Sequence, residues 1–266
     1  ADRVLSLVEE ADEADLTRYF AALRDEFEVD LDEVLATAAR AQTERLNALN
    51  ALQRAAEPPR QELFRRLNAA PRGTARLVDL RRKLLAALRK DQSLALIDSD
   101  LRHLLRSWFN RGFLVAARID WHSPADLLEK IIAYESVHAI DSWDALRERL
   151  VPPDRRCFAF FHPAMPNDPL IFVEVALGKG LAESIQDILA SPRELVPAEK
   201  ADTAIFYSIS NCHKGLAGIS FGAFLIKQVA SDLKAELPNL KTFATLSPVP
   251  GLSKWMKERK IPDALL

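Results

Sequence analysis

The chain has little glycine and cysteine and no strong excess of charge of either sign. Only 8 of its 266 residues are glycine and only 2 are cysteine, and the formal net charge is -2 at pH 7. Proteins that bind nucleic acid usually carry a basic excess, so no nucleic-acid partner is expected. The two cysteines, Cys157 and Cys212, lie far apart in sequence, which favours a reduced, cytoplasmic setting.

Long apolar runs and clustered metal ligands are also missing. No run approaches the ~18 apolar residues that a membrane-spanning helix needs, and the acidic start lacks the basic-then-apolar pattern of a signal peptide. Histidine and cysteine show no metal-ligand spacing, so we expect neither membrane association nor a metal site. Hydrophobic residues make up 48% of the chain, and its length suggests one large or two ordinary domains.

The first 111 residues have the pattern of a helical bundle. Gly73 is the only glycine before Gly112, and apolar residues recur at steps of three and four from Leu16 to Leu35. Pro58-Pro59 interrupts this pattern. Further helices are predicted over 62–68, over 74–88 with Thr74 as the N-cap, and over 94–109. We predict an all-α domain over 1–111, with one face as a candidate oligomer interface.

Near Gly112 the pattern changes to a mixture of helices and strands. Short helices are predicted after Ser123-Pro124 and after Asp141 or Ser142. A further helix is predicted over 181–189 and a long one over 221–237. Strands are predicted over Cys157–His162, Leu170–Leu177, Ala204–Ser210 and Leu240–Ser247. The predicted fold class is therefore α+β: a helical bundle followed by an α/β domain over 112–266.

A loop punctuated by glycines links the strand at 204–210 to the helix that follows. Gly215, Gly218 and Gly222 allow positive φ and a close approach of the backbone to a ligand. The helix start adds unpaired N–H groups and the positive end of a dipole, which favour a pyrophosphate. The spacing matches neither a dinucleotide fingerprint nor a Walker loop, so a turn without a ligand is the alternative. His213, inside the loop, is a further candidate for a phosphate contact.

Ser247 is predicted at the C-terminal end of its strand, the edge of an α/β sheet at which ligands bind. Pro248 and Pro250 restrict the backbone that follows it. A serine that only begins a turn is the alternative.

Three segments taken together resemble the malonyl-CoA decarboxylase family. They are FYSIS at 206–210, GLAGISFGAFLIK at 215–227 and LSPVPG at 246–251. The resemblance implies a helical oligomerisation domain followed by a catalytic domain with the fold of the acetyltransferases, and homo-oligomers, tetramers or dimers, formed through the helical domain. It implies the decarboxylation of malonyl-CoA to acetyl-CoA and CO2 through a thioester enolate.

The resemblance also implies which residues act. Ser247 matches the family's catalytic serine. No metal or organic cofactor is implied, because the thioester takes up the electrons and CoA is part of the substrate. The residues that match the family's CoA-binding loop are Ala217, Gly218, Ile219, Ser220, Phe221, Gly222 and Ala223.

Relatives in this family continue past the Ser-Pro-x-Pro-Gly segment to a catalytic histidine, and no residue of this chain matches it. We therefore expect the C-terminal part of the catalytic domain to be missing from this sequence, and the 266-residue chain by itself to be weak or inactive. Two alternatives to decarboxylation remain. One is an acyl-CoA N-acyltransferase, which the fold alone would allow, and the other is an inactive CoA-binding scaffold.

Overall fold

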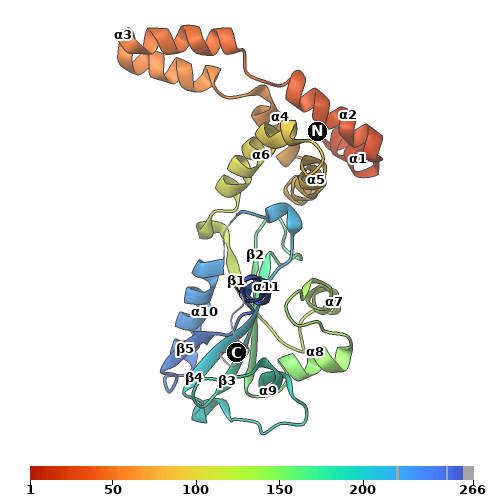
Figure 1. The fold of residues 1–266 in the computed structure, drawn as a ribbon, viewed down its shortest axis with the longest axis vertical. Helices are drawn as coiled ribbons and strands as arrows, with labels where there is room; N and C mark the ends of the chain where they lie inside the picture. Colours follow the sequence, from red (N-terminus) through yellow and green to blue (C-terminus); the bar gives the residue numbers. More distant parts are fainter. Residues whose placement is uncertain (220–221, 250, 260–266) are drawn as a thin grey trace. The chain divides into compact units, whose positions relative to one another are not determined.

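The computed structural model describes residues 1–219, 222–249 and 251–259, without the side chains of 42–46, 222, 223 and 253 (Figure 1). The chain forms two compact units. The first unit contains Ala1–Ala116, Phe160–Ile171 and Asn211–Ala223, and the second contains the rest. Helices in the N-terminal region and a five-stranded sheet later in the chain confirm the predicted α+β class. The domain boundary at residue 112 stays a prediction.

The first unit is mainly helical. Its core is apolar, and Phe64, Leu77, Leu84, Ile97 and Leu101 are completely buried. Because these residues recur at helical spacing, each helix turns one stripe towards the others. The elements are α1 (Asp2–Glu10), α2 (Glu13–Asp25), α3 (Leu31–Ala55), α4 (Pro59–Asn68), α5 (Gly73–Leu88), α6 (Ala95–Trp108) and the 3-10 turns η1 (Gln92–Leu94), η2 (Arg111–Phe113) and η4 (Lys214–Leu216).

The N-terminal cap predicted for α5 is wrong. The N-cap is Arg72, two residues before Thr74, and the helix begins at Gly73 after Arg72 turns the chain with a φ of 56°. Thr74 lies inside the first turn, and its hydroxyl donates to Asn68 Oδ1 at 2.8 Å. A Cβ atom on Gly73 would lie 2.4 Å from the carbonyl oxygen of Leu67, so only glycine lets α5 start this close to the end of α4.

The second unit is built around the sheet, whose strand order is β1-β2-β3-β4-β5. The strands are β1 (Val115–Ile119), β2 (Arg155–Phe161), β3 (Ile171–Gly178), β4 (Thr203–Asn211) and β5 (Thr242–Thr245). The helical elements are α7 (Ala125–Tyr134), α8 (Trp143–Leu150), α9 (Ile185–Leu189), η3 (Ala198–Lys200), α10 (Gly222–Glu236) and α11 (Leu252–Glu258). Leu225, Val229 and Leu233 form the completely buried stripe of α10.

The last two strands of the sheet run parallel to each other. Their register pairs Thr203 with Thr242 and Phe206 with Thr245. β3 is the middle strand and is buried along almost its whole length, as expected for a strand covered on both faces. The sheet therefore places the C-terminal end of β5 beside the middle of β4.

Several predicted element bounds need correction. Ser123 is not a cap, because Pro124 takes the N-cap position of α7 and the Ser123 hydroxyl instead accepts from the Asp120 N–H. Ser142 is the cap of α8, accepting from the Ala145 N–H at 3.1 Å, which confirms one of the two residues proposed. The strand expected over 240–247 is shorter, and β1 and α11 were not predicted.

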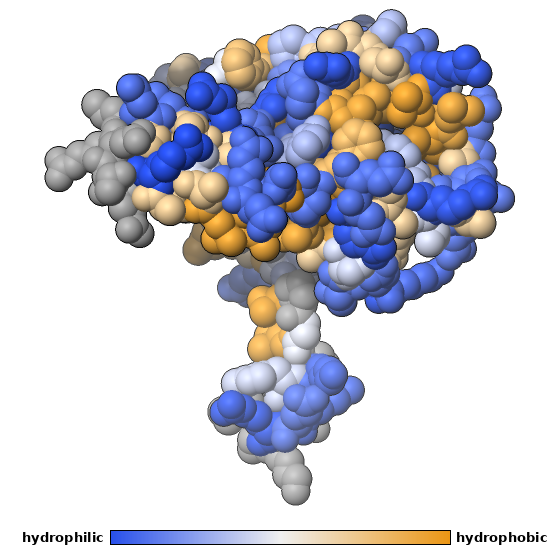
Figure 2. All heavy atoms as spheres, turned by 90° about the horizontal axis from the view of Figure 1, so that it is seen from above, coloured by the Kyte–Doolittle hydropathy of each residue, from blue (hydrophilic) through white to orange (hydrophobic). Residues whose placement is uncertain are grey.

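The surface of the described residues is mixed in polarity. Figure 2 shows one face, on which hydrophilic residues surround smaller hydrophobic patches. Among the helices that the structure describes, none is both long and apolar enough to cross a membrane.

Candidate active site

The predicted CoA-binding residues begin in the loop between β4 and α10. Ala217 and Gly218 are exposed, and Ile219 is buried with 8% of its surface accessible. Ser220 and Phe221 lie outside the described residues. Gly222 and Ala223 form the start of α10, and their side chains are not described. The loop up to Ala223 belongs to the first unit.

A buried arginine of α5 holds this loop from inside the first unit. Arg81 is 1% exposed, and its Nη1 donates to the carbonyl oxygens of Gly215 at 2.7 Å and Ala217 at 2.8 Å. Its Nε donates to Asp98 Oδ1 at 2.8 Å, so the charge is paired. The guanidinium therefore turns the two carbonyls of the loop inward and fixes the loop to the helices.

Two glycines permit this arrangement, each for a different reason. A Cβ atom on Gly215 would lie 1.9 Å from the carbonyl oxygen of Val78, so a larger residue would push the loop away from α5. Gly218 has a φ of +77°, a backbone conformation that residues with a side chain rarely adopt. The N–H groups of Ala217 and Ile219 donate back into the loop, whereas that of Gly218 has no acceptor among the described residues. Within the described part of the chain, the exposed end of the loop thus has a donor without an acceptor.

His213, the other loop candidate, faces Asp168. Its Nε2 lies 3.7 Å from Asp168 Oδ2, and its side chain is only 12% exposed. The ring is therefore directed at a carboxylate of the first unit rather than at open solvent, which argues against a direct phosphate contact.

Ser247 comes two residues after the end of β5, in the second unit. The N–H of Leu246 still donates to the carbonyl oxygen of Phe206 at 2.9 Å, which extends the parallel pairing by one residue. Pro248 has no N–H to continue a ladder, and the strand ends before it. Ser247 is exposed.

A network of polar groups buried in the second unit contacts the C-terminal half of β4. Both serines of the FYSIS segment take part, because the Ser208 hydroxyl donates to Glu135 Oε2 at 2.7 Å and lies 3.3 Å from the Ser210 hydroxyl. Glu135 Oε1 accepts from the backbone N–H groups of Val137 at 2.7 Å and His138 at 2.8 Å. These bonds tie the connection between α7 and α8 to β4.

A buried ion pair lies close to this network. Arg149 Nη1 donates to Glu174 Oε2 at 2.8 Å, and its Nη2 donates to the carbonyl oxygen of His138 at 2.8 Å. Glu174 lies in the middle of β3 and is completely buried. Burial raises the pKa of Glu174 to about 7, and the nearby Arg149 charge opposes this rise. Burial also raises the pKa of Tyr207, on β4, well above its usual value.

The raised pKa of Glu174 predicts a pH-dependent stability. Because the pKa of Glu174 is about 7 in the folded state and 4.5 for an unperturbed glutamate, the folded state holds a proton that the unfolded state releases between these values. The contribution of Glu174 to the free energy of unfolding therefore falls by about 3 kcal/mol as pH rises through this window. Denaturant unfolding of the wild type and the Glu174→Gln variant from pH 4.5 to 8 measures it. The free energy of unfolding of the wild type minus that of the variant should decrease as the pH rises to about 7. A difference that stays constant over this pH range would contradict the raised pKa of Glu174.

Sequence reasoning missed Arg81 and Glu174, although each leaves a signal. Arg81 interrupts the apolar stripe formed by Leu77, Leu80 and Leu84, and Glu174 is the one charged residue of LIFVEVAL. A charged residue at a core position needs a partner, so such positions point to buried ion pairs. The partner itself cannot be read from the pattern.

Two further observations bear on what the chain binds. Within the described ranges no group of three or more histidine, cysteine, aspartate or glutamate side chains is arranged to hold a metal ion.

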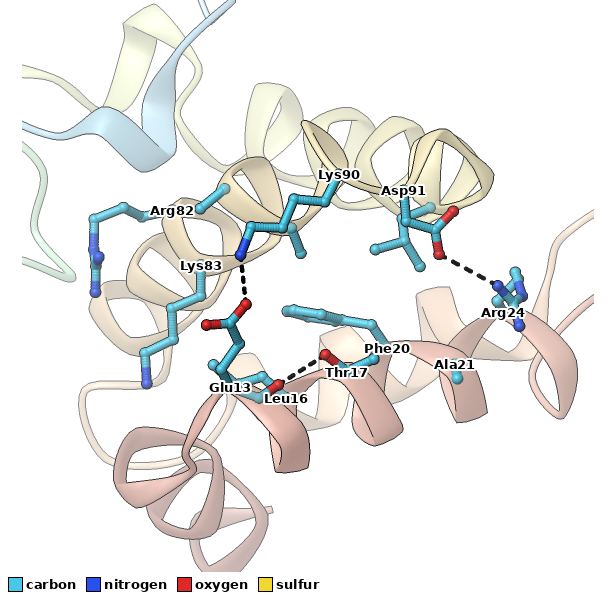
Figure 3. Close-up of a pocket in the computed structure, with 13 residues that line it drawn as sticks. Glu13, Leu16, Thr17, Phe20, Ala21, Arg24, Arg82, Lys83, Lys90 and Asp91 are labelled. Atoms are coloured by element: carbon cyan, nitrogen blue, oxygen red, sulfur yellow. Dashed lines mark hydrogen bonds and ion pairs between the residues drawn. The ribbon is translucent and has the colours of Figure 1, made fainter.

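A cavity of about 520 Å³ lies between α2 and α5, with Phe20 and Leu16 among its apolar lining residues (Figure 3). Its charged rim is paired, through Glu13 with Lys90 and Arg24 with Asp91. None of the predicted site residues lines it.

Comparison with protein families yields two matches. The model described as the malonyl-CoA decarboxylase N-terminal domain matches residues 27–109, and that of the malonyl-CoA decarboxylase C-terminal domain matches residues 112–265. The mitochondrial malonyl-CoA decarboxylase of Rattus norvegicus is 38% identical over 221 residues, which are 79% of this chain and 44% of that protein. The mitochondrial malonyl-CoA decarboxylase of Anser anser anser is 41% identical over 205 residues, which are 75% of this chain and 40% of that protein.

Solved structures agree with these matches. The crystal structure of malonyl-CoA decarboxylase from Rhodopseudomonas palustris is 54% identical with a TM-score of 0.90, over 98% of this chain and 64% of that one. The corresponding structure from Agrobacterium vitis is 48% identical with a TM-score of 0.93, over 99% and 64%. The chain thus spans less than half of these curated relatives and somewhat under two thirds of the solved ones. This chain belongs to the malonyl-CoA decarboxylase family.

Proposed function

We propose that this chain acts in the decarboxylation of malonyl-CoA to acetyl-CoA and CO2. Membership of the family supports the reaction, and the loop held by Arg81 is the structural observation that supports the substrate. Its carbonyls at Gly215 and Ala217 are turned inward, and the N–H of Gly218 is left for a ligand. A loop that hides its acceptors and offers a donor before a helix start suits an anion.

In this proposal the residues of the loop, Ala217 to Ala223, bind the diphosphate of CoA. The backbone approaches the ligand closely where Gly218 has no side chain. The start of α10 adds the positive end of a helix dipole. The negative charge of the diphosphate is then held largely by backbone groups.

Ser247 acts on the malonyl group. Decarboxylation breaks the bond between the carboxylate carbon and the α-carbon, and the electron pair moves into the thioester carbonyl to form an enolate. A hydroxyl that donates a hydrogen bond to the thioester oxygen stabilises the charge that grows there. A proton is then delivered to the α-carbon to give acetyl-CoA. The thioester takes up the electrons, so this step requires no metal or organic cofactor.

The products distinguish this proposal from its alternatives. We expect a preparation that contains the whole natural protein to consume malonyl-CoA without any amine acceptor and to release equal amounts of acetyl-CoA and CO2. Chromatography measures the acetyl-CoA, and trapping of labelled CO2 measures the CO2. Consumption that depends on an amine would favour an N-acyltransferase. CoA binding measured by calorimetry without any turnover, by a preparation that contains the whole natural protein, would favour an inactive scaffold.

We also propose that this protein forms homo-oligomers through its helical region. We further propose that it is located in the cytoplasm. Large apolar side chains of α3 are exposed, including Leu31 at 63% and Leu35 at 59%, and a second copy could cover them. Both cysteines are buried thiols, which fits a reducing compartment. Light scattering measures the oligomeric state.

A further inference from the structure

Arg102, an exposed arginine of α6, lies against the solvent-facing end of the loop between β4 and α10. The Cδ atom of Arg102 is 3.9 Å from the position where a Cβ atom of Gly218 would be. Both residues are exposed, and both belong to the first unit. The side chain that comes nearest to the open position at Gly218 therefore ends in a permanent positive charge.

Arg102 has no hydrogen bond or ion pair with any residue that the structure describes. This distinguishes it from three arginines of the same unit, Arg60, Arg76 and Arg81, each of which is held by at least one carboxylate. The acidic residue one turn before it on α6, Asp98, is already paired with Arg81 at 2.8 Å. The charge of Arg102 is therefore available to a ligand.

The surroundings of Arg102 favour an anion over any other ligand. Arg81 holds the carbonyl oxygens of Gly215 and Ala217 on the inner side of the loop, so these acceptors are not offered at the outer side. The N–H of Gly218 has no acceptor among the described residues, and the aliphatic part of the Arg102 side chain lies next to this residue. A guanidinium has several N–H donors in one plane, which matches the oxygens of a phosphate group.

We propose that Arg102 binds a phosphate group of coenzyme A, so that the helical region supplies a side chain to the coenzyme site. The inference rests on the proposed function, because it takes the ligand of the loop to be a CoA thioester. Two groups of CoA have this chemistry, the diphosphate and the 3′-phosphate. In either case Arg102 acts in binding and takes no part in the bond changes.

Isothermal titration calorimetry with CoA and with 3′-dephospho-CoA tests this proposal. The variants are Arg102→Ala, Arg102→Lys and the control Arg89→Ala, which removes another exposed arginine of the helical region. We expect Arg102→Ala to weaken CoA binding about tenfold, a size typical of one charge-assisted contact. Arg102→Lys should lose less, because it keeps the charge without the planar donors. Arg89→Ala should bind like the wild type.

The two ligands identify the phosphate involved. If Arg102 binds the 3′-phosphate, Arg102→Ala weakens CoA binding and leaves dephospho-CoA binding unchanged. If it binds the diphosphate, the affinities for both ligands fall together. Unchanged affinity of Arg102→Ala for both ligands would overturn the inference and leave the proposed function intact. A wild-type chain that binds neither ligand would overturn the proposed function, and this inference with it.

Discussion

Replacing Ser247 with alanine is expected to lower the rate of malonyl-CoA decarboxylation by about 10²–10³-fold in kcat, the effect typical of losing one donor to a developing oxyanion. The KM should change little, because the hydroxyl contacts the acyl group most strongly in the transition state. Ser247 is exposed and follows the last hydrogen bond of β5, so its removal should not disturb the sheet. Steady-state kinetics on a preparation that decarboxylates malonyl-CoA measure both constants.

The matched control for this experiment is Thr242→Val. It removes an exposed hydroxyl from β5, the strand that precedes Ser247, and keeps a residue that favours strands. We expect the control to keep wild-type kinetics. A fall of kcat/KM that comes from KM alone would make Ser247 a binding residue. Full activity of Ser247→Ala would exclude any role in the reaction.

Replacing Arg81 with alanine is expected to destabilise the first unit by about 3–5 kcal/mol, the usual cost of breaking a buried ion pair. The change leaves Asp98, which is 8% exposed, without its partner and removes the donor to Gly215 and Ala217. Denaturant unfolding measures the loss. Arg82→Ala is the control, since Asp79 is the one ion-pair partner of that exposed arginine among the described residues, and its loss should cost under about 1 kcal/mol.

A double variant separates the stability of the unit from the shape of the loop. In Arg81→Met with Asp98→Leu, apolar side chains replace both charges, and much of the stability should return. The loop carbonyls still lack their donor, so CoA affinity should stay low although the protein is folded. Recovery of both stability and CoA affinity would show that Arg81 does not position the loop.

The elements around the candidate site were predicted unequally well. The helix predicted over 221–237 is observed as Gly222–Glu236, because its apolar residues recur at steps of three and four and pack as one stripe. The strand expected to reach Ser247 pairs only as far as Leu246. Its length depends on the partner strand and on Pro248, and neither effect is visible in the alternation of residues. The roles of Ser247 and of residues 217–223 stay predictions.

The sequence by itself determined the family, through three segments whose residues are directly comparable, and the α+β class, through periodicities that act over a few residues. Only the tertiary structure decided which groups support the loop. Arg81 and Gly215 are 134 positions apart, and Arg81 and Ala217 are 136 apart. A hydrogen bond depends on distance and direction in space, and folding brings together groups whose separation along the chain says nothing about either.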